Sequence, residues 1–186
     1  GRLLPTLAQL RDALRARATD FADILKLGRT HLMDAVPTTL GRSFDSFAVQ
    51  IDHGIARIEG TLPRLLTLPQ GGTAAGTGLN APAGFAQAFS AELGRLTGHA
   101  FRPNPCQVEG MAAHDALLEL SGMLNVIAAS FIKIANYLRW MSSGPNCGIG
   151  ELIMPEDGLT SSIMPGKRNP TIAEVMIQTG MQVAGN

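Results

Sequence analysis

The sequence predicts an all-α protein, because helical periodicity recurs along the chain and no segment shows a period of two. Hydrophobic residues make up 45% of the 186 positions and charged residues only 16%, which favours a sizeable core over a disordered chain. The longest helical segment, at about residues 108–141, is apolar on more than one side. A helix of that kind suits the middle of a long bundle rather than the surface of a small domain.

The first two helices are separated by a short break. Apolar residues recur mostly at three- and four-residue steps over about residues 3–27, which predicts the first helix. Glycine and proline interrupt this pattern in residues 28–37. Thr38 or Thr39 can then N-cap a second helix that runs to about Leu62.

Two irregular segments lie between the remaining helices. Residues 71–82, GGTAAGTGLNAP, form a glycine-rich connection that lacks the preceding strand of a Rossmann fingerprint and the terminal Gly-Lys-Ser/Thr of a Walker A loop. A third helix is predicted over residues 82–98, with Gly98 as its C-cap. A long irregular segment, residues 142–170, precedes a final helix that starts near Pro170, and loops of this length are often functional.

The composition excludes several classes of protein. Lys plus Arg equal Asp plus Glu, at 15 each, which argues against a nucleic-acid-binding protein. No run is expected to span a membrane, because polar and charged residues interrupt the most hydrophobic one. These residues are Glu119, Asn125, Lys133 and Asn136. Cys106 and Cys147 fit neither a disulfide framework nor a zinc motif, and are expected to be buried free thiols of a cytoplasmic protein.

Residues 161–170, SSIMPGKRNP, combine the features of an anion-binding loop. The prolines and Gly166 shape a loop rather than a helix interior. Positive charge, a directed amide and the N-terminus of the following helix together favour a carboxylate. The alternative is an ordinary solvated loop between helices. The candidate site residues of this loop are Ser161, Ser162, Lys167, Arg168 and Asn169.

A histidine and a glutamate outside this loop are further candidates. His31 follows Thr30 in the break between the first two helices, where it could transfer protons near neutral pH or, alternatively, cap a helix end. Glu174 lies in the first turn of the final helix, where the helix dipole favours a carboxylate, and it could orient a histidine from a distant segment. No histidine pairs with another ligand type at metal spacing, so no metal site is expected.

Five stretches resemble, in the same order, those of class II fumarases, which belong to the fumarase/aspartase lyase superfamily. They are GRTHLMDAVPTTLG, GGTAAGTGLNAP, AAHDALLELSG, KIANYLRWMSSGPNCGIGE and SSIMPGKRNP. The resemblance implies a long-helix bundle whose central helices form a homotetramer, with active sites built from three subunits. It also implies that residues 1–186 are the central helical region of a longer protein, without its upstream segment and its small C-terminal domain.

The resemblance implies the reversible trans addition of water to fumarate, giving L-malate in the tricarboxylic acid cycle, without metal or organic cofactor. Ser161 resembles the residue that takes the proton from carbon 3 of malate. His31 resembles the histidine that works with water at the other face, and Glu174 the carboxylate that polarises it. The implied substrate contacts are Thr30, Ser162, Lys167 and Asn169.

Four residues depart from the fumarase pattern, namely Met33, Tyr137, Thr160 and Arg168. Most fumarases have a small aliphatic residue at the position of Arg168, which is therefore a candidate to contact a larger or more anionic substrate. Aspartases usually carry glutamine and alanine where this chain has His31 and Gly166, which favours a fumarase. Two alternatives stay open: another lyase that releases fumarate, of the aspartate, adenylosuccinate or argininosuccinate type, or a catalytically silent fragment of a helical assembly.

Overall fold

The structure, a computed structural model, describes residues 1–156 and 161–186 and is mostly helical, which confirms the predicted fold class. Two small sheets of two strands each, which the sequence did not predict, lie between the helices. The helices are α1 (Leu3–Asp20), α2 (Leu40–Leu65), α3 (Phe85–Thr97), α4 (Gln107–Ala112), α5 (Asp115–Met141) and α6 (Thr171–Gly185). The strands are β1 (Leu25–Thr30), β2 (Met33–Thr39), β3 (Thr67–Leu68) and β4 (Arg102–Pro103).

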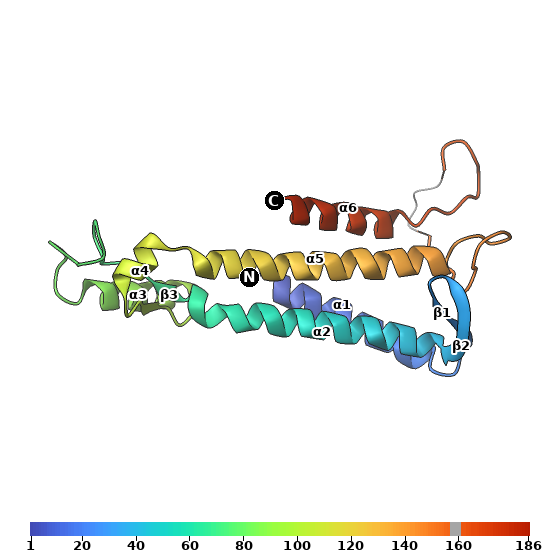
Figure 1. Cartoon of the computed structure of the whole chain (residues 1–186), viewed down its shortest axis with the longest axis horizontal. Helices are drawn as coiled ribbons and strands as arrows, with labels where there is room; N and C mark the ends of the chain where they lie inside the picture. Colours follow the sequence, from blue (N-terminus) through green and yellow to red (C-terminus); the bar gives the residue numbers. More distant parts are fainter. Residues whose placement is uncertain (157–160) are drawn as a thin grey trace. The chain divides into compact units, whose positions relative to one another are not determined.

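The chain forms two compact units, whose elements Figure 1 labels. The first unit comprises residues 1–55 and 124–186, and the second comprises residues 56–123. The limits between them fall inside α2 and α5. All of the site residues predicted from the sequence belong to the first unit.

The first helix ends earlier than the sequence predicted, at Asp20. The carbonyls of Phe21 and Ile24 accept hydrogen bonds from the backbone N–H groups of Gly41 and Leu40, each at 2.8 Å. These two donors open α2, and the first N–H groups of a helix have no partner inside it. The residues after Asp20 therefore leave the helical path and satisfy the start of α2 instead.

Residues 25–39 form a β-hairpin rather than the irregular break that the sequence predicted. The two strands pair antiparallel, and the last pair before the turn is Thr30 opposite Met33. His31 and Leu32 make the turn with φ angles of 53° and 63°, which is the left-handed geometry of a tight hairpin turn. His31 therefore lies at the tip of a hairpin and does not cap a helix.

The second helix begins at a threonine N-cap, as predicted. Thr39 Oγ1 accepts the N–H of Arg42 at 3.2 Å, which is the bond expected of an N-cap residue. Downstream, α2 enters the core of the first unit with Phe47 and Ile51, each 1% exposed. The other buried apolar residues of this unit are Leu7, Leu14, Leu40, Phe44, Ala48, Ile127, Ala128, Ile134, Ala135, Met141, Ala173 and Ile177. Helices α1, α2, α5 and α6 therefore all bury apolar residues within this unit.

Small residues allow α6 to pack closely on α5, and Figure 1 shows the two helices side by side. Ala135 of α5 is buried in one cluster with Ala173 and Ile177 of α6. A side chain added at Gly180 of α6 would meet Cγ1 of Ile132 at 2.7 Å. This packing fixes α6, whose N-terminus follows the candidate loop.

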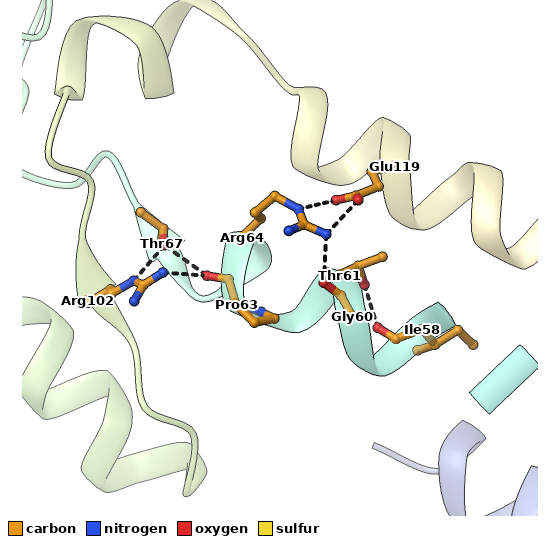
Figure 2. Close-up of polar contacts among 8 residues, drawn as sticks. All are labelled: Ile58, Gly60, Thr61, Pro63, Arg64, Thr67, Arg102 and Glu119. Carbon is orange, nitrogen blue, oxygen red and sulfur yellow. Dashed lines mark hydrogen bonds and ion pairs between the residues drawn. The ribbon is translucent and has the colours of Figure 1, made fainter. Parts of the chain in front are cut away.

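In the second unit, side-chain hydrogen bonds and an ion pair stabilise the C-terminal end of α2 (Figure 2). Pro63 lies inside α2, and its carbonyl accepts hydrogen bonds from the Arg102 guanidinium at 3.2 Å and the Thr67 hydroxyl at 3.0 Å. Arg64 donates two bonds of 2.6 Å to the Glu119 carboxylate of α5. These side chains supply partners at a helix end, where backbone carbonyls lack them, and they link α2 to α5 within this unit.

The glycine-rich connection adopts conformations that favour glycine, as predicted. Gly71, Gly76 and Gly78 have φ angles of 96°, 81° and 71°, in the left-handed region that glycine enters without a steric penalty. A side chain at Gly76 would in addition collide with the backbone of Val108 in α4. The connection is therefore packed against α4 as well as turned.

We expect Gly76→Ala to destabilise the protein more than Gly84→Ala, although both glycines have positive φ angles, 81° and 77°. A left-handed alanine costs about 1 kcal/mol at either position. Nothing lies within 4 Å of a Cβ added at Gly84, whereas overpacking at Gly76 adds about 1–3 kcal/mol. Chemical denaturation of both variants at one protein concentration measures the difference, and equal losses would contradict the packing role of Gly76.

The long helix predicted over residues 108–141 is in fact two helices. α4 ends at Ala112, and Ala113 is extended, with φ −120° and ψ 147°. The carbonyl of His114 then accepts the N–H of Leu117 at 3.0 Å as α5 begins. Neither glycine nor proline marks this break. The prediction rested on helix propensity alone and therefore missed it.

Among the described residues, α5 is long and apolar enough to cross a membrane by length and composition alone, so its polar residues do not by themselves exclude a span. A core helix of a soluble protein can be equally long and apolar. Only 17% of its most apolar stretch is buried in this chain. Its exposed large apolar residues are Leu117, Leu118, Val126, Tyr137 and Trp140. A single chain therefore leaves much apolar surface of α5 uncovered.

Both cysteines are free, as predicted, but they are exposed rather than buried. Cysteine usually lies inside proteins, which was the basis of the prediction. Cys106 directly precedes α4 and Cys147 follows α5. Connections such as these run over the surface, because their backbone polar groups need water.

Candidate active site

The loop before α6 folds into a tight turn around Ser161. The Oγ of Ser161 accepts a hydrogen bond from the N–H of Met164 at 3.2 Å, and its own N–H donates to the carbonyl of Lys167 at 3.4 Å. Gly166 allows this reversal with a φ of 80°. An N–H donated to an oxygen favours negative charge on it, so this turn suits a serine that acts as a base.

The loop's other candidates lie around this turn. Ser162 and Lys167 are exposed, and Asn169 is half-buried. Pro170 directly precedes α6, and its carbonyl accepts the N–H of Glu174 at 3.1 Å in the first helical turn. The N-terminus of this 15-residue helix carries partial positive charge. Together with the Lys167 ammonium, it makes this end of the first unit suitable for a carboxylate.

Arg168 pairs with Glu156 in the structure. Its Nη2 lies 2.6 Å from Oε1 of Glu156, and the two side chains are 58% and 64% exposed. A pair this exposed contributes about 0–1 kcal/mol. Thr160, one of the four residues that depart from the fumarase pattern, lies outside the described residues.

Charged residues that the sequence analysis missed anchor the hairpin. Glu151 Oε1 lies 2.8 Å from Arg29 Nη2, and its Oε2 lies 3.2 Å from Lys26 Nζ. The three side chains are only 17%, 25% and 11% exposed, respectively. The N–H of Glu151 donates to the carbonyl of Met141, the last residue of α5, at 2.7 Å. These contacts tie the hairpin and its histidine turn to the end of α5.

The same contacts predict an acid sensitivity. Burial disfavours the charged form of Glu151, but hydrogen bonds and charges from Arg29 and Lys26 outweigh it, so the pKa of Glu151 lies below its ordinary value of 4.5. A carboxyl whose pKa is lowered on folding contributes stability above its unfolded pKa and loses it as the pH falls through the folded one. We expect unfolding free energy to drop below pH 4.5, less steeply in Glu151→Gln. Urea denaturation across this range tests it, and equal slopes would refute it.

Glu174 contacts α5 and not His31. Its Oε1 accepts a hydrogen bond from Nη2 of Arg139 at 3.2 Å, and Arg139 also donates to Asn136 at 3.3 Å. In the part of the chain that the structure describes, no hydrogen bond or ion pair joins Glu174 to His31. The C-terminal end of α5 thus holds the start of α6 through Arg139 and the hairpin through Glu151.

Two surface pockets among the described residues include none of the predicted site residues. One lies in the second unit and is lined mainly by the glycine-rich connection, with Phe85 and Met111. The other lies in the first unit between α1 and the start of α2. The predicted residues are exposed or half-buried on the surface of the first unit.

The chain is similar to known proteins over its full length. It is 52% identical over 186 residues to the mitochondrial fumarate hydratase of Rhizopus oryzae and 51% identical to the class II fumarate hydratase of Nitrosomonas europaea. The alignments cover all of this chain, but only 38% and 40% of those relatives. The crystal structure of class II fumarase from Schistosoma mansoni has a TM-score of 0.95 at 36% identity, covering 98% of this chain and 41% of that one.

These alignments confirm the resemblance to class II fumarases that the motifs suggested. They also show that the chain spans about two fifths of the length of the curated relatives it matches. The profile of the family described as lyase matches residues 1–185. The chain therefore belongs to the lyase family.

Proposed function

We propose that the protein containing this chain catalyses the reversible hydration of fumarate to L-malate. The observation that carries the proposal is the turn of residues 161–170 at the N-terminus of α6. It combines the oxygen of Ser161, the ammonium of Lys167 and a helix dipole in one short segment. The similarity to fumarate hydratases, at 52% and 51% identity, supports the same activity.

The reaction begins with loss of a proton from carbon 3 of malate. Ser161 reacts as the alkoxide, whose charge the N–H of Met164 stabilises; its Oγ takes this proton, and the electron pair of the C–H bond moves into the adjacent carboxylate. Lys167 and Asn169 hold the charge that develops there. The electron pair then returns to form the double bond between carbons 2 and 3 as the bond between carbon 2 and its hydroxyl oxygen breaks, and the hydroxyl leaves as water with a proton supplied on the side of His31. Fumarate is the product, and the reverse sequence gives L-malate.

The remaining residues bind substrate and orient the histidine. Thr30 and Ser162 contact the substrate carboxylates. Glu174 polarises the histidine of another subunit, as the shared active sites implied by the resemblance to fumarases suggest; within its own chain it bonds to Arg139. The exposed apolar surface of α5 supports a homotetramer in which central helices pack together and each site draws on several subunits.

A lyase acting on a larger, more anionic substrate is the second candidate, and Arg168 is the residue that favours it. Its guanidinium is paired with Glu156 at 2.6 Å, but both side chains are exposed, so the pair would not prevent a substrate contact. The similarity to fumarate hydratases supports a small dicarboxylate instead. We place the activity in the tricarboxylic acid cycle and the protein in the cytoplasm. The named relatives include mitochondrial as well as bacterial proteins, and cell fractionation with an antibody to the chain decides between compartments.

The full-length protein that contains this chain provides the test. Fumarate formation from L-malate is followed by ultraviolet absorbance, with aspartate, adenylosuccinate and argininosuccinate as competing substrates. We expect activity on malate alone, and light scattering should give a tetramer. Activity on only a larger substrate would favour the second candidate and assign Arg168 a substrate contact. A folded tetramer without activity on any of them would mean a silent assembly.

A further inference from the structure

The contact between Glu151, Arg29 and Lys26 is the least exposed ion-pair group among the described residues. One carboxylate faces two cations, at 2.8 and 3.2 Å. All three side chains are half-buried, and their partial desolvation offsets some of the attraction between the charges. Besides its contribution to stability, the group fixes the position of the hairpin relative to Glu151.

Glu151 itself is held rigidly. Besides its own N–H bond to Met141, the N–H of Leu152 donates to the same carbonyl at 2.9 Å, and the N–H of Gly150 donates to the carbonyl of Ser143 at 2.8 Å. Oγ of Ser143 accepts the N–H of Ile149 at 3.0 Å. The backbone that carries the carboxylate is thus fixed to the end of a 27-residue helix.

The hairpin, by contrast, needs an external anchor. Two-stranded hairpins are marginally stable in water, and this one exposes Leu25, Met33 and Val36 by 79%, 70% and 69%. Its turn places His31 and Leu32, two residues with side chains, at positive φ. Such conformations are costly, and they persist only where the surrounding structure imposes them.

The irregular register of the hairpin lets both cations reach one carboxylate. Lys26 and Arg29 are three residues apart, so in a regular strand they would point to opposite faces. The pairing shifts between Leu27 and Arg29, and a shift of this kind increases local twist. Arg29, only two residues before His31, thereby contacts Glu151 together with Lys26.

We propose that Glu151 is a positioning residue, which holds the His31 turn in its reactive place through Arg29 and Lys26. This inference rests on the proposed function, in which His31 works at the second face of the substrate. Glu151 does not touch the substrate. It anchors the hairpin, which is otherwise exposed and strained, to the end of α5.

The test measures malate dehydration by the full-length protein carrying Glu151→Gln. Because a small displacement of a reacting group is enough to slow the chemistry, we expect kcat to fall about 10-fold while KM changes less than about twofold. Glu151→Asp, which keeps the charge, should recover part of the loss. Glu92→Gln is the matched control, since Glu92 forms an exposed ion pair with Arg95 on α3, and it should leave kcat unchanged.

Combining substitutions distinguishes positioning from a general loss of structure. If Glu151 acts through the histidine, Glu151→Gln should cost little further kcat in a His31→Asn background. Full additivity in that background would overturn the proposal, as would unchanged kcat in Glu151→Gln. Should Glu151→Gln fail to fold, Lys26→Gln keeps the Arg29–Glu151 pair, and the same cycle with His31→Asn applies.

The proposed function fails separately. A wild-type protein that does not dehydrate malate would remove the proposed function and this inference with it. A His31→Asn variant with unchanged kcat would remove the role of His31 and therefore this inference, but not the proposed function. An active wild type that is slowed by His31→Asn but not by Glu151→Gln removes the inference alone.

Discussion

Replacing Ser161 by alanine is expected to lower kcat for malate dehydration by about 10²–10⁴-fold, the range typical of a lost general base. The physical reason is that the proton on carbon 3 then has no acceptor within the turn. In the folded loop Ser161 Oγ is held by the N–H of Met164 at 3.2 Å. No other side-chain oxygen among the described residues accepts that N–H.

The same substitution should barely change stability. Met164 is 59% exposed, so its N–H can bond to water once Oγ is gone, and the loss should stay within about 0.5 kcal/mol. Ser162→Ala removes a proposed substrate contact and should mainly raise KM. Ser46→Ala, on the exposed part of α2, serves as the unaffected control.

Steady-state kinetics and thermal unfolding of the three serine variants provide the measurement. A Ser161→Ala protein that keeps wild-type kcat would show that this serine is not the base. A loss of kcat accompanied by a large loss of melting temperature would point to folding rather than chemistry.

The helices were predictable because their signals are local. The N-cap at Thr39 and the left-handed C-cap at Gly98, with a φ of 75°, follow from short-range chemistry that needs no partner from elsewhere in the chain. The hairpin gave no such signal. β1 has half-buried residues at four consecutive positions rather than alternating ones, and its turn is His-Leu instead of the usual Asn-Gly.

The candidate site likewise combines features with a local sequence signal and features without one. The loop of residues 161–170 carries its chemistry in consecutive residues, so a loop with these groups could be predicted from the sequence, whereas its turn around Ser161 was found only in the structure. The contacts that position the other elements join distant residues. Glu151 meets Arg29 and Lys26 across more than a hundred positions of the chain, and no spacing rule connects them.

The expected pairing of Glu174 with His31 shows a further limit. Family motifs carry a functional relationship without saying whether both partners belong to one chain. In the structure, Glu174 has Arg139 as its partner. A pairing between subunits is therefore a matter of assembly, which neither the sequence nor a single chain specifies.

Replacing Phe47 by alanine is expected to give the largest loss of stability, about 3–5 kcal/mol, because it combines lost burial with a cavity. Phe47 is 1% exposed at the centre of the first unit. Its ring lies 5.8 Å from that of Phe44 and 6.0 Å from that of Tyr137, measured between centroids. Such ring pairs add about 0.5–1.5 kcal/mol beyond the buried area.

Phe47 also shields a lysine from water. The Nζ of Lys133 lies 4.9 Å from the Phe47 ring centroid and 4.8 Å from that of Tyr137, and it donates to Gln50 at 3.2 Å. Burial lowers the pKa of Lys133. Removing the ring admits water to the ammonium, so part of this pKa shift should disappear together with the cation–π contact.

Phe89→Ala is the matched control, because Phe89 is 36% exposed on α3 and also has a neighbouring ring, that of Phe85, at 6.1 Å. Less apolar area is buried there, so it should cost about 1 kcal/mol. Denaturant midpoints of both variants, at one protein concentration, measure the contrast. Similar losses for the two would mean that the core of the first unit does not depend on Phe47, and that the apolar surface of α5 carries more of the stability through assembly.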